Sequence, residues 1–156
     1  MTDFPKIELT ADIYGCMRLD TFLELCDDIN YNADHLCFDS GTSEINRRKI
    51  LKTSKHLIRT PEILKRVTKE IIEDYARSNT RYLELRSTPR EYGEIFSTEY
   101  HYIGAIYDAI FEAEDEIPTI KVAYIISIDN LCTEDEVDDF VHLVERYKEK
   151  AMNEEY

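Results

Sequence analysis

The sequence predicts an α/β protein with a parallel sheet of about three strands and flanking helices. Residues 6–12 alternate apolar and polar side chains, which is typical of a strand. Residues 63–76 repeat apolar side chains at a period of about 3.6, which is typical of a helix that packs through one face. Strands and helices of this kind alternate along the chain, and that order favours right-handed βαβ crossovers between parallel strands.

The first strand is predicted at residues 6–12 and the first helix at residues 19–29. The two faces of the strand carry different side chains, with Ile7, Leu9 and Ala11 on one face and Glu8, Thr10 and Asp12 on the other. Asp20 or Thr21 is expected to cap or start the helix, because short polar side chains accept hydrogen bonds from free N–H groups there. Residues 30–43 are rich in Asn, Asp, Ser and Gly, which predicts a loop.

Two helices are predicted in the middle of the chain, at residues 43–58 and 60–78. The second begins with Thr60 and Pro61, residue types that favour the N-cap and the first helical position. Later elements are a strand at 81–86, a helix at 98–114, a strand at 120–128 and a helix that starts with a capping box, Thr133 to Glu136. The helix at 98–114 is expected to bury one apolar face: Ile103, Ile106, Tyr107, Ile110 and Phe111.

The bulk composition excludes several kinds of partner. A formal net charge of −14 without a basic stripe argues against nucleic acid and against an anionic membrane surface. No apolar run approaches the roughly 18 residues of a membrane span, and the N-terminus lacks the pattern of a signal peptide. The four cysteines have no C-x-x-C spacing, so we expect free thiols and a cytoplasmic location: Cys16, Cys26, Cys37 and Cys132.

Charged residues mark the ends of the three predicted strands, at Asp12, Arg86 and Asp129. Because ligands of parallel α/β proteins bind at the carboxyl ends of the strands, these side chains are the candidate site. A reading without function remains open, in which Glu8, Glu84 and Arg86 form a satisfied ionic cluster on the sheet.

Two segments carry a resemblance to a known family. Residues 5–15, P-K-I-E-L-T-A-D-I-Y-G, resemble the first-strand signature of the adenosine deaminase family, P-K-[VI]-E-L-H-x-H-[LI]-x-G. Residues 81–90, R-Y-L-E-L-R-S-T-P-R, are similar to a block of the branch that acts on N-methylated AMP. Residues 122–129 are similar to the next strand of that branch. The resemblance covers roughly residues 4–150.

This resemblance implies a partial TIM-type (β/α)₈ barrel, with residues 1–156 forming a single domain that matches the N-terminal part of the barrel. A complete barrel needs about 250 residues. We therefore expect a truncated barrel, with roughly five of its eight units absent.

The resemblance also implies a metal site that this chain has altered. Family enzymes use zinc held in part by the two histidines of the first strand, and Thr10 and Asp12 occupy those two positions here. One carboxylate beside a threonine falls short of the three protein ligands that a catalytic zinc usually has. We therefore expect no zinc, no other cofactor and no catalytic residue in this chain.

The resemblance further implies four substrate-binding residues: Arg86, Ser87, Thr88 and Asp129. Tyr14 stands where the branch has a short polar residue that contacts substrate, so we expect its phenol to fill space that a nucleotide needs. Gly15 is expected at a turn.

Three functions are compatible with these residues. The first is an adenosine deaminase-like protein of purine nucleotide metabolism, from a hydrolase family that deaminates adenosine or N-methylated AMP with zinc. It would be a pseudoenzyme, inactive alone, that binds purine nucleotide weakly. The alternative is a non-catalytic interaction protein whose open sheet edges pair with itself or with a full-length relative. A chain with no role of its own is the third.

Overall fold

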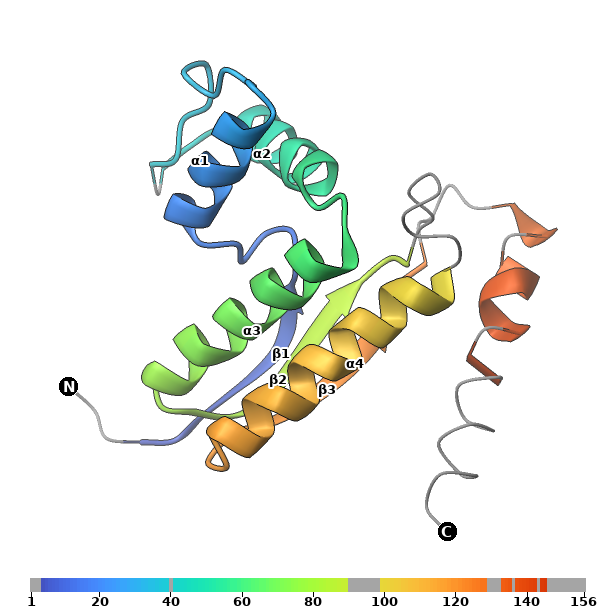
Figure 1. Ribbon diagram of the computed structural model, residues 1–156. Helices are drawn as coiled ribbons and strands as arrows, with labels where there is room; N and C mark the ends of the chain where they lie inside the picture. The colour runs from blue at the N-terminus through green and yellow to red at the C-terminus, as the bar shows by residue number, and fades with distance from the viewer. Residues whose placement is uncertain are drawn as a thin grey trace, which may run out of the picture.

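The computed structural model describes residues 4–39, 41–89, 99–128, 133–135, 137–142, 144 and 145. The elements are, in order, β1 (Lys6–Asp12), α1 (Leu19–Asp28), α2 (Glu44–Leu57), α3 (Pro61–Arg77), β2 (Thr80–Ser87), α4 (Glu99–Glu116) and β3 (Lys121–Ile126). The strands form one parallel sheet in the order β1-β2-β3. Helices α3 and α4 cover one face of this sheet, and α1 and α2 form a pair beyond the carboxyl end of β1 (Figure 1). The predicted α/β class and parallel strands are confirmed.

Helix α3 is the central helix, and its start follows the predicted chemistry. The Thr60 hydroxyl oxygen accepts a hydrogen bond from the Ile63 N–H at 3.2 Å, and Pro61 occupies the first turn. One stripe of α3, which includes Leu64, Val67 and Ile71, is fully buried against the sheet and α4. Each such side chain contributes about 1.5–3 kcal/mol to folding.

The main core lies between the sheet and its two helices. Leu83 and Leu85 of β2 are fully buried there against Ile103 and Ile106 of α4. Phe111 was predicted on this buried face but is exposed. The prediction was wrong because the helical periodicity assigned more residues to the buried face of α4 than that face contains.

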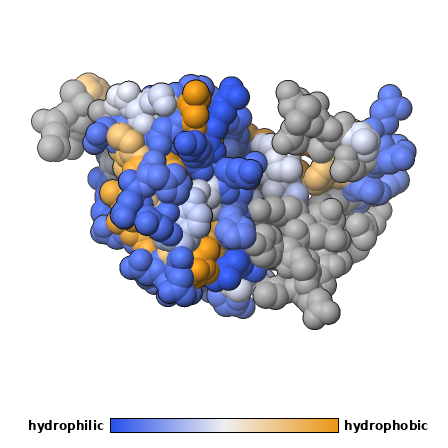
Figure 2. Space-filling model, turned by 90° about the horizontal axis from the view of Figure 1, so that it is seen from above, coloured by the Kyte–Doolittle hydropathy of each residue, from blue (hydrophilic) through white to orange (hydrophobic). Residues whose placement is uncertain are grey.

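A second, smaller core joins α1, α2 and the loop between them. Its buried residues are Phe22, Leu25, Cys26, Leu36 and Leu57. Viewed from the end of the molecule that carries this helix pair, the surface is largely hydrophilic, with separate apolar groups (Figure 2). The helix pair therefore has a small apolar core, against which Met17 and, from α3, Ile63 also pack.

Several local predictions need correction. The N-cap of α1 is Arg18, which makes no side-chain capping bond, so the expected cap by Asp20 or Thr21 is wrong. The Thr21 hydroxyl instead donates to Glu70 of α3 at 2.6 Å. The predicted box at residues 133–136 depends on Glu136, which lies outside the described residues.

The expected free thiols are confirmed for Cys16, Cys26 and Cys37, whereas Cys132 is outside the described residues. Of the helices that the structure describes, none has the length and apolar character needed to cross a membrane.

Strand β1 departs from the alternation that its sequence suggests. Its pairing with β2 shifts between Glu8, which lies opposite Leu83, and Ala11, which lies opposite Leu85. This bulge inserts one extra residue, so Glu8 and Asp12 do not share a face as predicted. The expected apolar face also fails, because Ile7 and Leu9 are 67% and 51% exposed on an edge strand and only Ala11 is buried.

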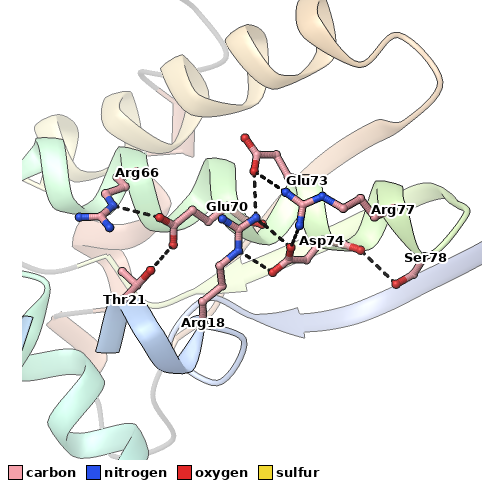
Figure 3. Close-up of polar contacts among 8 residues, drawn as sticks. All are labelled: Arg18, Thr21, Arg66, Glu70, Glu73, Asp74, Arg77 and Ser78. Atoms are coloured by element: carbon pink, nitrogen blue, oxygen red, sulfur yellow. Dashed lines mark hydrogen bonds and ion pairs between the residues drawn. The ribbon is translucent and has the colours of Figure 1, made fainter. Parts of the chain in front are cut away.

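An arginine connects the start of α1 to α3. The Arg18 guanidinium donates to both carboxylate oxygens of Asp74 at 2.8 Å, to Glu73 at 2.8 Å and to the Glu70 carbonyl at 3.1 Å (Figure 3). These bonds lower the pKa of the Asp74 carboxyl below its ordinary value. The planar guanidinium of Arg18 thus holds the segment between β1 and α1 against the side of α3.

We expect Arg18→Gln to lower the free energy of unfolding by about 1–2 kcal/mol, because several charge-assisted bonds of a half-buried group are lost. Urea denaturation measures this. Arg77→Gln is the matched control, since Arg77 pairs with the same Glu73 and Asp74 but is largely exposed, and its loss should be about 0.5 kcal/mol or less.

The Arg18 contribution should also depend on pH. A lowered pKa means that the stabilisation is present above the ordinary Asp pKa of 3.8 and disappears as the pH falls through the folded value of Asp74. The difference between wild type and Arg18→Gln should therefore shrink in acid. Equal losses for the Arg18 and Arg77 variants at neutral pH would contradict the role given to Arg18.

Candidate functional site

The candidate site lies where β1 and β2 end. Asp12 and Arg86 are opposite each other in the sheet, and the Arg86 Nε lies 4.0 Å from an Asp12 carboxylate oxygen. Both side chains are partly exposed to solvent. The structure therefore brings together two of the three predicted strand-end charges, while Asp129 lies outside the described residues.

The Asp12 carboxylate also closes the turn that follows β1. One of its oxygens accepts hydrogen bonds from the N–H groups of Tyr14 at 2.9 Å and Gly15 at 3.1 Å. The Asp12 carbonyl accepts from the N–H groups of Gly15 and Cys16, each at 3.0 Å. Gly15 thus lies at a turn, as expected. Asp12 acts here as a local turn residue, with one oxygen on the backbone and the other facing Arg86.

Thr10 and Asp12 do not fit a zinc site. Thr10 lies in the β1 bulge, and its N–H donates to the Glu8 carboxylate at 3.2 Å. Its side chain offers a hydroxyl in place of an imidazole, and the Asp12 oxygens are engaged by backbone N–H groups and Arg86. Within the described part of the chain, no group of three or more His, Cys, Asp or Glu is placed to hold a metal ion.

Glu84 does not complete the ionic cluster that the sequence allowed. Its carboxylate accepts a hydrogen bond from the Tyr82 hydroxyl at 2.9 Å. Among the described residues, the ion pair of Arg86 is with Asp12. Arg86 therefore remains at the strand end, with most of its hydrogen-bonding capacity facing solvent.

Ser87 belongs to a buried hydroxyl network. Its oxygen accepts a hydrogen bond from the Tyr102 hydroxyl at 3.1 Å and lies 2.9 Å from the Tyr124 hydroxyl. Tyr102 in turn lies 2.6 Å from the Tyr14 hydroxyl. Burial, with the neighbouring phenols as lesser causes, raises the pKa of Tyr102 well above its ordinary value, so the network is neutral.

This network turns Ser87 and Tyr14 toward the helices. The Ser87 side chain is buried on the face covered by α4, and Thr88 is half-buried just beyond it. The Tyr14 ring is also buried, with the Lys55 Nζ 5.4 Å from its centroid. The sequence analysis missed Tyr102. Its position next to the apolar face of the predicted helix was the available signal, because a buried tyrosine usually has a hydrogen-bond partner for its hydroxyl.

The fold and the site define a class of protein. Parallel strands with helices on one face and polar residues at their carboxyl ends are the arrangement of TIM-barrel proteins, here represented by three strands. The adenosine deaminase family model matches residues 5–153, and the chain belongs to this family.

Relatives place the chain near one branch of the family. It is 30% identical over 148 residues to the N6-methyl-AMP deaminase of Bos taurus, covering 92% of this chain and 42% of that protein. The structure matches the Arabidopsis N6-mAMP deaminase with a TM-score of 0.81 at 27% identity, over 94% of this chain and 47% of that one. An Arabidopsis ADAL structure complexed with GMP matches with a TM-score of 0.79 at 26% identity, over 92% and 46%. The chain thus spans less than half the length of these relatives.

We expect Tyr14→Phe to lower the free energy of unfolding by about 1 kcal/mol, because a buried hydrogen bond to Tyr102 is lost. Urea denaturation measures the change. Tyr31→Phe is the matched control: its hydroxyl bonds to His35 and Thr53 are long, at 3.4 and 3.3 Å, and should contribute less. If both variants lost the same stability, the network would have no special weight in the fold.

Proposed function

We propose that this chain binds a purine nucleoside monophosphate at the carboxyl ends of its strands and does not deaminate it by itself. The observation that carries this proposal concerns Asp12, which stands where the family resemblance implies a metal ligand. Its carboxylate instead accepts hydrogen bonds from the following turn and pairs with Arg86. The proposal concerns this chain alone. We also propose a cytoplasmic location, because free thiols favour a reducing compartment.

Arg86 supports the nucleotide part of the proposal. Its guanidinium is about half exposed at the end of β2, where a bound anion can reach it. Guanidinium groups bind phosphate oxygens through paired hydrogen bonds and also stack on aromatic bases. GMP is the ligand in the Arabidopsis ADAL structure, which makes a purine monophosphate the ligand to test.

The remaining predicted residues take different parts in this proposal. Thr88 lies two residues after Arg86, just past the end of β2, and we propose that its hydroxyl contacts the ligand. Ser87 is engaged with tyrosines, so we assign it the role of fixing the strand end on which Arg86 stands. Asp129 remains a proposed contact outside the described residues.

The inactive part of the proposal follows from donor chemistry. Zinc lowers the pKa of a bound water from 15.7 to about 7. At 1.36 kcal/mol per pKa unit, losing this effect costs up to about 12 kcal/mol in the availability of hydroxide. Thr10 and an occupied Asp12 offer no comparable way to activate water.

We expect GMP to bind the wild-type chain weakly, and Arg86→Gln to weaken that binding by about tenfold, because a charge-assisted contact to phosphate is lost. Isothermal titration measures both. Arg81→Gln is the matched control, since Arg81 is an exposed arginine at the opposite end of the same strand and should leave binding unchanged.

The same preparation tests the absence of turnover. Incubated with zinc and N6-methyl-AMP, the chain should retain no stoichiometric metal and release no methylamine. Turnover with bound zinc would refute the inactive part of the proposal, and equal GMP binding by the Arg86 and Arg81 variants would refute the nucleotide part.

A second candidate function has its own supporting observation. β1 and β3 are the two edges of the described sheet, and the edge at β1 carries exposed Ile7 and Leu9 near an exposed Phe4. Because both edges run in the same direction, β3 of one molecule can pair in parallel with β1 of another. We propose pairing with a second copy, or with a full-length relative, as the alternative use of this edge.

We expect the chain to self-associate as its concentration rises, and Ile7→Lys to shift it toward monomer, because a charge on an edge strand opposes pairing. Size-exclusion chromatography with light scattering measures the mass. Ile45→Lys is the matched control, since Ile45 is 70% exposed on α2, a helix that takes no part in the sheet edge. A monomer at all concentrations would remove this candidate.

A further inference from the structure

A cavity of about 400 Å³ lies between α1, α2 and the turn after β1. Its walls are mainly apolar and include Leu19 and Phe22 of α1, Phe38 of the following loop, and Ile50 and Leu51 of α2. Cavities of this size hold small organic ligands. The cavity shares the turn at Gly15 with the strand-end site, but Arg86 does not line it.

A buried hydroxyl in the cavity wall has no partner. Ser54 of α2 lines the cavity and is 1% exposed, and within the described residues its hydroxyl makes no hydrogen bond. A buried polar group without a partner destabilises the folded protein. A ligand group that bonded to Ser54 would offset that cost, so this hydroxyl marks a polar contact point in a mainly apolar site.

A positively charged side chain, Arg47, lies on the same face of α2, nearer the start of the helix than Ser54. Arg47, Ile50, Leu51 and Ser54 follow the i, i+3, i+4, i+7 spacing and all line the cavity. At 1.5 Å per residue, Arg47 and Ser54 are about 10 Å apart along the helix axis. Arg47 is exposed and has no ion pair in the part of the chain that the structure describes. Its guanidinium is free to bind an anion at the cavity rim.

The aromatic side chains define the middle of the cavity. The rings of Phe22 and Phe38 meet edge to face, with centroids 5.3 Å apart, and Phe38 is partly exposed. An aromatic ligand gains more from such a wall than an aliphatic one, since ring pairs add attraction beyond burial.

We propose that this cavity binds a small hydroxyaryl carboxylate, with the carboxylate on Arg47, the ring against Phe22 and Phe38, and the phenolic hydroxyl bonded to Ser54. Arg47 and Ser54, about 10 Å apart along the axis of α2, are the two polar partners proposed for such a molecule. Arg86 does not line this cavity, so the variants that test the two proposals are different residues.

The test uses 3-(4-hydroxyphenyl)propanoate as the probe, titrated calorimetrically into the full chain. A molecule of this size should bind with a Kd of about 1 mM or tighter. Arg47→Gln should weaken binding by about tenfold, because the charge-assisted contact is lost, and the methyl ester of the probe should show the same loss. Ser54→Ala should weaken it by about fivefold, through one neutral hydrogen bond.

Two matched variants act as controls. Arg48→Gln removes a neighbouring exposed arginine of α2 that pairs with Glu44. Thr68→Val removes another buried hydroxyl that has no partner within the described residues, on α3 and outside the cavity. Both should bind the probe as wild type does. Ser54→Ala should also melt no lower than wild type, which separates lost binding from lost folding.

Three results would overturn the proposal. The first is no binding of the probe to wild type. The second is unchanged binding by both Arg47→Gln and Ser54→Ala. The third is displacement of the probe by GMP together with weaker probe binding in Arg86→Gln, which would place the probe at the strand ends.

Discussion

The turn closed by Asp12 is the constraint on which the rest of the structure depends. Its carboxylate holds the N–H groups of Tyr14 and Gly15, and its carbonyl holds those of Gly15 and Cys16. The chain therefore leaves β1 in one direction, which sends the Tyr14 ring under α4 and brings Arg18 to α3. The position of the α1–α2 pair, the buried hydroxyl network and the cavity beside Gly15 all follow from that direction.

The same residue relates the fold to the family chemistry. A barrel strand can keep its backbone pairing and its place in the core while the side chains at its tip change, because the core depends on Ala11 and its neighbours and not on Thr10 or Asp12. Family membership and the family reaction are therefore separate properties of such a chain. Here Asp12 has become part of the turn that supports the site.

Local chemistry made much of the fold predictable. Thr60 and Pro61 fixed the start of α3, and the apolar stripe that follows them fixed its buried face. The strand at residues 81–86 was also expected within a residue of its observed ends. In these segments the residues that decide the structure are close in sequence.

The features that could not be predicted depend on distant partners. The bulge after Glu8 is defined only by the pairing of β1 with β2. The partners of Arg18 are carboxylates more than 50 residues away along the chain. Asp12 and Arg86 were expected at the site because strand ends converge, whereas the link from Ser87 to Tyr102 requires knowing how α4 lies on the sheet. The unpartnered Ser54 could be recognised only once α1 was packed against α2.

The contact between the α1–α2 pair and α3 combines apolar and polar groups, because Ile63 of α3 packs against the smaller core and ion pairs lie beside it. Arg66 donates to Glu24 at 2.6 and 2.7 Å in an exposed ion pair, and the buried Thr21 donates to Glu70 at 2.6 Å. Ionic strength screens exposed charge pairs and leaves apolar burial intact. Raising the salt concentration therefore weakens the exposed Arg66–Glu24 pair first and leaves the apolar packing of Ile63 in place.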